Sequence, residues 1–300
     1  MNRIVFFGNE QLAQGLNNPI TPTFNGLIAS DNEVIALVLP RRIKMTSRKA
    51  HELKIVEAAQ ENNIDIIYAD EVDLPKTLQD LNATIGVLVS YGKIVPQSVI
   101  DAFPHGIVNI HPSLLPKYRG STPLEIAIVN GDSETGVSLM ALTAGMDSGP
   151  VYTQEKITLS PDETKYTLYE KAINLGSELL LNNIDDIMSG KLKPSEQDES
   201  EATFTQQLSK TNGDLDLITE TSAECERKIR AYLGFPKTRV NLLENKIIVT
   251  KAKVLADFNG DNWPDVVKCA NNSYLQIEEI ISPKSGKIMK TTDYLRGLHL

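Results

Sequence analysis

The first two thirds of the chain alternate between short apolar runs and stretches of helical or polar character. Five runs of strand length, rich in Val and Ile, follow one another: RIVFFG, EVIALVLP, DIIYA, TIGVLVS and GIVNI. Short apolar strands separated by helices are typical of a parallel, doubly wound α/β sheet. In such a sheet the ligand crevice lies at the carboxyl ends of the strands. We therefore predict a Rossmann-like domain with its functional site at that edge.

Other segments complete this first domain. Helices are expected at 47–63 and 164–190, which have amphipathic spacing, and at 96–103, which opens on a proline. The runs GVSLMAL and VYTQEKITL are expected to add strands to the same sheet. After Gly190 the sequence becomes polar and charged, with few large apolar residues. We interpret 191–206 as a linker that follows a domain of residues 1–190.

The pattern changes again beyond the linker. One helix is expected at 221–234, and the rest of the chain holds short apolar runs separated by turn-forming stretches such as NNS and SPKSGK. Five or six short strands with one helix fit a small open β-barrel of the OB type. We therefore predict a second domain over residues 207–300.

The charge of the chain is unevenly distributed. The formal net charge is -9, which on its own disfavours a nucleic-acid partner. Residues 205–300, however, carry 14 Lys and Arg against 12 Asp and Glu, whereas residues 1–204 carry 16 against 27. The segment RRIKMTSRK after the second expected strand is basic throughout and holds no acid: Arg41, Arg42, Lys44, Arg48 and Lys49. Such a loop at the crevice mouth suits phosphate contacts, although a solvated surface loop has the same composition.

Several classes of protein are disfavoured by the composition. Cys225 and Cys269 form no metal-binding or disulfide pattern. No apolar run reaches the ~20 residues that a membrane-spanning helix needs. The start, MNRIVFFGNE, lacks a small-residue cleavage site and is interpreted as a first strand rather than a signal peptide. We predict a cytoplasmic protein with no membrane segment and no metal site.

A pair of polar residues ends the fifth expected strand. Asn109 and His111 are two residues apart, so both side chains project from one face of the strand. Strand interiors disfavour asparagine, and Pro112 ends the pairing at once. A third polar residue, Asp147, lies in GMDSGPV between glycines that permit close backbone approach. An aspartate in that loop can reach the histidine.

These three residue types form a functional set. The amide donates a hydrogen bond to a developing oxyanion, a protonated imidazole does so with charge, and a carboxylate orients the ring. No Ser or Cys lies in a recognisable nucleophile motif, which favours direct attack by an external amine. Taken singly, each residue also has a structural interpretation, as a strand-end asparagine, a surface histidine or a turn-forming aspartate. The other histidines, at 51, 105 and 299, receive only that structural interpretation.

The region from NIHPSLLPKYRG through GDSETGV to GMDSGPV resembles the folate-dependent formyltransferases. That family shows Asn-x-His with Pro-Ser-Leu-Leu-Pro, then Arg-Gly, then Gly-Asp-x-Glu-Thr-Gly-Val, then an Asp in a Gly-rich loop, all present here in this order. The resemblance implies catalytic roles for Asn109, His111 and Asp147 and requires no metal. It implies 10-formyltetrahydrofolate as formyl donor, held by a loop made of Ser113, Leu114, Leu115 and Pro116.

The part beyond residue 190 is similar to the branch of that family that formylates methionyl-tRNA. This similarity implies initiator methionyl-tRNA as acceptor, a role in translation initiation, and contact of the basic segment 41–49 with the acceptor stem. Lysines and arginines of the second domain form either another RNA surface or a solvated face: Arg227, Lys228, Arg230, Lys237, Arg239, Lys251 and Lys253. A 10-formyltetrahydrofolate hydrolase, a sugar-amine formyltransferase and a non-catalytic RNA-binding protein remain alternatives. The chain departs from the family in FFGNEQLAQGL, which keeps Gly8, and at Tyr118, where the family has Trp.

Overall fold

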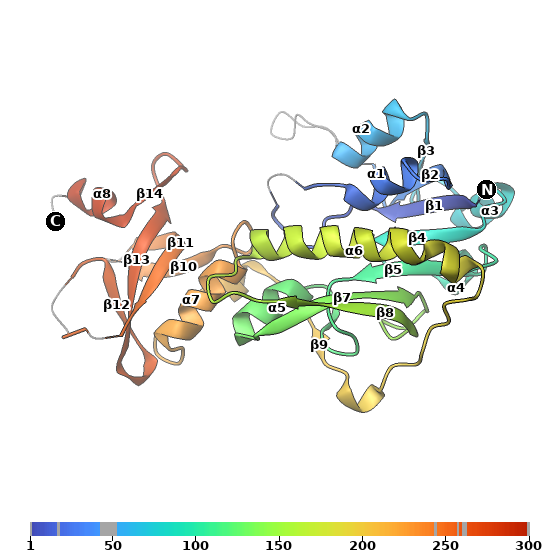
Figure 1. The fold of residues 1–300 in the computed structure, drawn as a ribbon. Helices are drawn as coiled ribbons and strands as arrows, with labels where there is room; N and C mark the ends of the chain where they lie inside the picture. The colour runs from blue at the N-terminus through green and yellow to red at the C-terminus, as the bar shows by residue number, and fades with distance from the viewer. Residues whose placement is uncertain are drawn as a thin grey trace.

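The chain forms two lobes with the termini at opposite ends of the molecule (Figure 1). The computed structural model describes residues 2–16, 19–42, 53–242, 245–256, 258–259 and 263–298. The larger, N-terminal lobe is built on a seven-stranded sheet in the order β3-β2-β1-β4-β5-β7-β8. The order reverses between β1 and β4, which is the topological switch point where such sheets hold their ligands. The Rossmann-like prediction is therefore confirmed.

The strands of this sheet follow the apolar runs of the sequence. β1 to β5 are mutually parallel, β7 is antiparallel to β5, and β8 is antiparallel to β7. Parallel strands are covered on both faces, which explains their continuous apolar sequences. Their bounds are Arg3–Gly8 for β1, Glu33–Leu39 for β2, Asp65–Tyr68 for β3, Ile85–Val89 for β4, Ile107–His111 for β5, Glu134–Ala141 for β7 and Val151–Thr158 for β8.

Helices cover both faces of this sheet. Alternate side chains of β1 pack into two different cores, one on each face of the sheet. Ile4 and Phe6 pack with α1, α2 and α6, whereas Val5 and Phe7 pack with α3 and α4. The long helix expected at 164–190 is present and begins with a capping box at Thr164. None of the helices in the described ranges is long and apolar enough to span a membrane. The helices are α1 (Pro22–Ile28), α2 (Lys54–Glu61), α3 (Leu74–Asp80), α4 (Gln97–Ile100), α5 (Pro123–Asn130) and α6 (Lys165–Met188).

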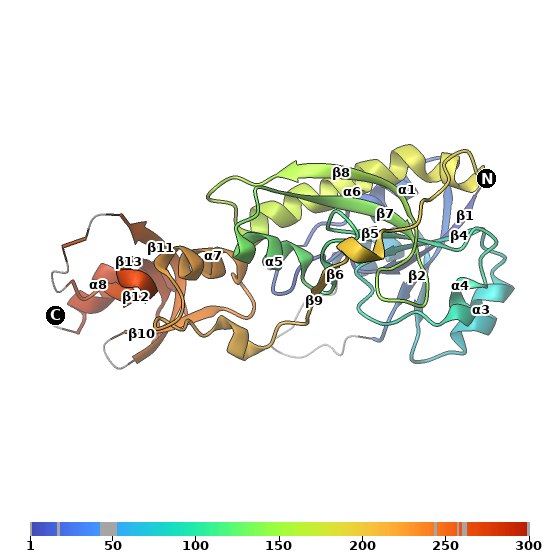
Figure 2. The same ribbon diagram turned by 90° about the horizontal axis from the view of Figure 1, so that it is seen from below.

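The segment expected to be a linker, 191–206, is hydrogen-bonded along its length to the N-terminal lobe. Ser195 exchanges two backbone hydrogen bonds with Val151, both 2.8 Å long. The short strand β9 (Phe204–Thr205) then pairs in parallel with β6 (Arg119–Gly120), and Figure 2 shows the two side by side. A 3-10 turn, η1 (Glu199–Glu201), lies between these two attachments. The segment connects the lobes and also packs against the larger one.

The C-terminal lobe is an antiparallel sheet contacted by the helices α7 and α8. The sheet runs in the order β10-β11-β13-β12, and β14 pairs with β13. Cys225 and Ile229 of α7 pack on the sheet, whereas Ala231 and Tyr232, at the end of the same helix, join the core of the larger lobe. The small β-barrel class predicted for this region is confirmed. Its elements are η2 (Lys210–Gly213), α7 (Ser222–Ala231), β10 (Thr238–Leu242), β11 (Asn245–Leu255), β12 (Val266–Cys269), η3 (Ala270–Asn272), β13 (Ser273–Ile281), β14 (Ile288–Lys290) and α8 (Thr291–Arg296).

A buried lysine connects the two lobes. Lys165 is fully buried, and its ammonium donates hydrogen bonds to the backbone oxygens of Gln14 (2.7 Å) and Phe235 (2.8 Å). The buried carboxyl group of Glu125 also faces it, with Oε1 3.9 Å from Nζ. Burial raises the pKa of Glu125 and lowers the pKa of Lys165 to about 8. Lys165 therefore joins the loop after β1 to the turn after α7.

A second buried carboxylate, Glu10, fastens the loop after β1 to the start of α1. It accepts hydrogen bonds from the backbone N–H groups of Thr23 (3.0 Å) and Phe24 (2.7 Å). Burial outweighs these hydrogen bonds and raises the pKa of Glu10 from its ordinary 4.5 to about 7. The folded protein therefore holds this proton more tightly than the unfolded chain does.

We expect the stability contributed by Glu10 to be complete below pH 4.5 and to be lost as the pH rises through about 7. The free energy of unfolding should be measured by urea denaturation at about pH 5 and about pH 8 for the wild type and Glu10→Gln. Glu10→Gln cannot titrate, so its loss of stability between the two pH values should be smaller than that of the wild type. An equal loss in both proteins would contradict the assignment.

Candidate active site

Strand β5, which lies between β4 and β7, carries the two polar residues singled out in the sequence. Asn109 pairs across the sheet with Leu88 of β4 and Met140 of β7, so its backbone is fixed on both sides. Asn109 is 5% exposed and His111 4% exposed, at the carboxyl end of the strand. A buried amide and imidazole on one strand face form a rigid, largely dehydrated pair of polar groups. In such surroundings, electrostatic interactions are stronger than in water.

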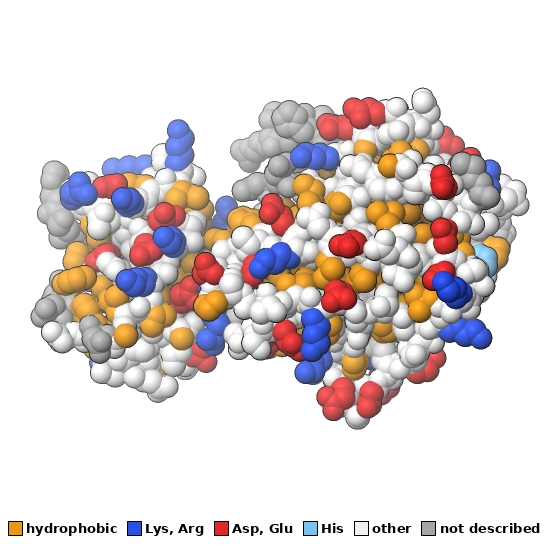
Figure 3. All heavy atoms as spheres, in the orientation of Figure 1, with side chains coloured by type: hydrophobic (Ala, Val, Ile, Leu, Met, Phe, Trp, Pro, Cys, Tyr) orange, Lys and Arg blue, Asp and Glu red, His pale blue; other side chains and the backbone are white. Residues whose placement is uncertain are grey.

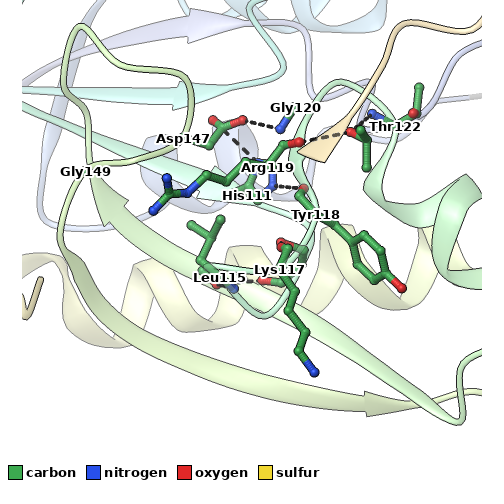
Figure 4. A network of polar contacts seen from close by, with 12 residues as sticks. His111, Leu115, Lys117, Tyr118, Arg119, Gly120, Thr122, Asp147 and Gly149 are labelled. Carbon is green, nitrogen blue, oxygen red and sulfur yellow. Dashed lines mark hydrogen bonds and ion pairs between the residues drawn. The ribbon is translucent and has the colours of Figure 1, made fainter. Parts of the chain in front are cut away.

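His111 lies between two acceptors (Figure 4). Its Nε2 is 3.0 Å from the backbone oxygen of Tyr118, and its Nδ1 is 3.7 Å from Oδ1 of Asp147. A carbonyl oxygen can only accept, so Nε2 must carry a proton in this contact. The second carboxylate oxygen of Asp147 accepts a hydrogen bond from the Gly120 N–H at 2.8 Å.

The Asp147 loop has a constrained backbone. Asp147 has φ 47, in the left-handed region that side-chain-bearing residues rarely adopt. Two residues later, a Cβ on Gly149 would lie 1.9 Å from the backbone oxygen of Ala141, so only glycine fits there. This is the close approach predicted from the glycines of GMDSGPV. The structure brings Asp147 to His111 as expected.

The loop after His111 is fastened by side chains of the neighbouring strands. Ser113 Oγ donates to the Lys117 backbone oxygen (2.6 Å), and Leu114 packs over Gly136. The backbone N–H of Leu115 donates to Ser138 Oγ at 3.1 Å. The structure also has a pocket of about 310 Å³ between Leu115, Pro116, β8 and residues 195–198. The predicted donor-binding residues thus form a rigid loop at the edge of a pocket.

The predicted basic segment lies mostly outside the described residues. Arg41 is exposed, and Arg42 makes two hydrogen bonds to Glu71, of 3.1 and 3.3 Å, with its guanidinium 4.1 Å above the ring of Tyr68. This partner raises the pKa of Arg42 and lowers that of Glu71. The structure does not describe the other three predicted residues: Lys44, Arg48 and Lys49.

Several basic residues of the C-terminal lobe are used within the fold. Arg227 Nε donates to the Val129 backbone oxygen (2.8 Å), and Arg230 pairs with Glu226. Lys228 pairs with Glu220, and Arg239 donates to three backbone oxygens near the junction. On the face shown in Figure 3, basic and acidic side chains are interspersed over both lobes. These four residues are therefore better interpreted as parts of the fold than as an RNA-binding surface.

Sequence reasoning missed the contribution of residues 195–206 to this site. Arg119, which the motif Arg-Gly only marked, is 2% exposed and binds Gln197 and Glu199 of that segment. The polar composition of 191–206 gave no signal of this contact, because the partners are backbone oxygens and one guanidinium rather than an apolar core.

The arrangement suits acyl-type transfer through an oxyanion. It offers an amide and an imidazole, with a carboxylate beside the ring. Among the residues that the structure describes, no group of three or more His, Cys, Asp or Glu could hold a metal ion.

Comparison with other proteins agrees with this chemistry. The sequence model of the family described as formyl transferase matches residues 3–184. Methionyl-tRNA formyltransferase of Geobacter sulfurreducens is 30% identical over 99% of this chain and 94% of its own length. The protein of the same name from Roseiflexus sp. (strain RS-1) is 31% identical over 99% of this chain and 93% of its own length.

Solved structures share the fold. WlaRD, a sugar 3N-formyl transferase, has a TM-score of 0.68 at 20% identity and covers 92% of this chain and 97% of its own. HypX from Aquifex aeolicus, solved with tetrahydrofolic acid, has a TM-score of 0.62 at 15% identity and covers 98% of this chain and 46% of its own. At these identities the likeness concerns the fold alone. The match of the family model and the similarity to relatives along the whole chain show that this chain belongs to the formyl transferase family.

Proposed function

We propose that this chain transfers the formyl group of 10-formyltetrahydrofolate to the α-amine of methionine on initiator tRNA, for translation initiation. The observation that carries the proposal is the buried set of Asn109, His111 and Asp147 at the carboxyl end of β5. Its placement suits amide formation on a formyl carbon without a covalent enzyme intermediate. Similarity to relatives named methionyl-tRNA formyltransferase over nearly the whole chain supports the choice of acceptor.

The reaction proceeds by direct attack. The methionine amine forms a bond to the formyl carbon, and a tetrahedral intermediate carries negative charge on the former formyl oxygen. Asn109 donates to that oxygen and the imidazole of His111 stabilises it, each interaction being worth roughly 3–4 kcal/mol in the barrier. Asp147 orients His111 and accepts the amine proton, directly or through water. The bond from the formyl carbon to the folate nitrogen then breaks, and that nitrogen leaves protonated.

The donor and the RNA are assigned to different segments in this proposal. The donor is held by the loop of Ser113, Leu114, Leu115 and Pro116, which follows closely on His111 in the chain. RNA phosphates are contacted by the basic segment that includes Arg41 and Arg42. The division into a formyl-transfer domain (1–190), a connecting segment (191–206) and a tRNA-binding domain (207–300) is part of this proposal.

Replacement of Arg42 by Ala is expected to weaken binding of initiator tRNA and leave the KM for the folate donor nearly unchanged. The slope of log K against log salt is negative, and the loss of one phosphate contact should make it less steep by roughly 0.7–0.9. Filter binding at several salt concentrations measures the RNA affinity and its salt dependence, and steady-state kinetics give the KM for the donor. Glu71→Gln is the matched control, because it weakens the hold on Arg42 without removing the cation and should bind RNA as well as the wild type. A loss confined to folate binding would contradict the assignment of this segment.

The test of the proposed function compares acceptors. Purified protein and 10-formyltetrahydrofolate are incubated with methionyl initiator tRNA, with an amino-sugar nucleotide, or with no acceptor. Formyl-methionyl-tRNA as the product is the expected result. A formylated sugar, or free formate at the same rate in all tubes, would overturn the proposal in favour of a sugar-amine formyltransferase or a hydrolase.

A further inference from the structure

One side chain outside the catalytic set contacts both the Asp147 loop and Arg119. Gln197 Oε1 accepts hydrogen bonds from Arg119 Nε (3.0 Å) and Nη2 (2.8 Å). Gln197 Nε2 donates to the backbone oxygens of Asp147 (2.8 Å) and Gly149 (2.6 Å). A primary amide has two donor hydrogens and an oxygen with two lone pairs. All four positions of the Gln197 amide are therefore occupied.

The orientation of this amide is fixed by its partners. Arg119 is buried and has only donors, so it must face the Gln197 oxygen. The two carbonyls can only accept, so they must face the nitrogen. A flipped amide would place donor against donor and acceptor against acceptor. Arg119 is itself held by Glu199 through hydrogen bonds of 2.9 and 2.7 Å. The guanidinium thus fixes the orientation in which the Gln197 amide donates to the Asp147 loop.

The same segment also fixes the other side of His111. Thr203 Oγ1 accepts from the Tyr118 N–H (2.8 Å), and the Thr203 backbone oxygen accepts from the Arg119 N–H (2.9 Å). Tyr118 is the residue whose backbone oxygen faces His111 Nε2, and Gly120 donates to the Asp147 carboxylate. Figure 4 shows Arg119 extending from this stretch toward the Gly149 segment. Both neighbours of the imidazole are therefore attached to residues 195–206.

We propose that Gln197 is a positioning residue for formyl transfer, which sets the place of the Asp147 carboxylate relative to His111 by holding the backbone at Asp147 and Gly149. This inference rests on the proposed function. Asp147 has a positive φ, a conformation that neighbouring contacts must maintain, and Gln197 supplies a hydrogen bond to its own carbonyl. The family match ends at residue 184, so the site is completed from outside the matched region.

Gln197→Glu keeps the hydrogen-bond acceptor of this side chain and removes its donor. The carboxylate still accepts from Arg119 but cannot donate to the carbonyls of Asp147 and Gly149. We expect kcat for formyl transfer to fall roughly tenfold to a hundredfold, because small displacements of a catalytic group are costly. The KM values for folate and tRNA should stay near those of the wild type. Gln197→Met, which has similar length and no charge, should give the same split if it folds and guards against an effect of the added charge.

Two comparisons distinguish positioning from a general structural role. Glu201→Gln is the matched control, because Glu201 is an exposed residue of the same segment that has no part in this arrangement, and it should keep kcat near the wild-type value. In a double-mutant cycle, Gln197→Glu should lower kcat no further when Asp147 is already replaced by Asn. A purely structural effect would instead add to the loss caused by Asp147→Asn.

The outcomes are distinct. A lowered kcat, unchanged KM values and a non-additive cycle with Asp147→Asn support the positioning role. A wild-type kcat, a change in KM alone, or an additive cycle overturns it. If the wild type itself transfers no formyl group to initiator tRNA, the proposed function fails. If the wild type transfers it and Gln197→Glu does so equally well, only the positioning role fails.

Discussion

Replacement of Asn109 by Ala is expected to lower the single-turnover rate constant of formyl transfer roughly a hundredfold to a thousandfold, with His111→Ala in the same range. Both side chains are buried at the end of β5. In the proposed mechanism they stabilise the charge that develops on the formyl oxygen. The tetrahedral intermediate would lose one of its two donors in either variant. Rapid-quench measurement with enzyme in excess over methionyl initiator tRNA isolates this step from product release.

Asn183→Ala is the control for this prediction. Asn183 is a partly buried asparagine whose side chain donates to the Leu179 backbone oxygen within α6, away from the site. Its replacement should leave the rate constant near the wild-type value. Thermal unfolding of all three variants checks that the fold is retained. Near-full turnover by folded Asn109→Ala or His111→Ala would refute the catalytic assignment.

Lys165→Met is expected to lower the free energy of unfolding by about 3–5 kcal/mol. The substitution leaves the buried carboxylate of Glu125 without a cation and the backbone oxygens of Gln14 and Phe235 without a donor. A buried charge that has lost its partner is far more costly than an exposed one. Urea denaturation measures the loss. A double variant that also carries Glu125→Leu should lose less than the sum of the two single variants.

Lys156→Met is the matched control for the lysine. Lys156 pairs with Glu134 at 2.9 Å, but both side chains are more than half exposed. Water solvates Glu134 when its partner is removed, so the free energy of unfolding should barely change. An equal loss for Lys165→Met and Lys156→Met would contradict the role of Lys165 as a buried connection between the lobes.

The sheet could be predicted from the sequence because its strands carry their own signal. RIVFFG was expected as a strand and forms β1 over Arg3–Gly8, since a strand buried on both faces must be apolar throughout. Three short helices of the larger lobe, α1, α3 and α5, were not anticipated. Each has seven or eight residues, with a proline at its start and too few turns to show a period. Their helical form depends on packing against the sheet.

The proposed catalytic residues could be found from local rules, whereas the contacts that hold them in place could not. Asn109 and His111 share a face because strand side chains alternate, and the glycines around Asp147 marked a close backbone approach. Gln197 meets Asp147 across 50 residues of chain through a backbone oxygen, a contact that leaves no periodic or compositional trace. The polar segment 191–206 was therefore interpreted as a linker, although its polar groups form hydrogen bonds with the loops of the candidate site.

The central claim is tested most directly by single-turnover formyl transfer from 10-formyltetrahydrofolate to charged tRNA. The wild-type protein is mixed with methionine-charged initiator tRNA, with methionine-charged elongator tRNA, or with no RNA, and formyl-methionine and formate are measured together. We predict rapid transfer to the initiator, little to the elongator, and little formate without RNA. Formate release at one rate in all three mixtures, or no turnover of the donor at all, would contradict the account.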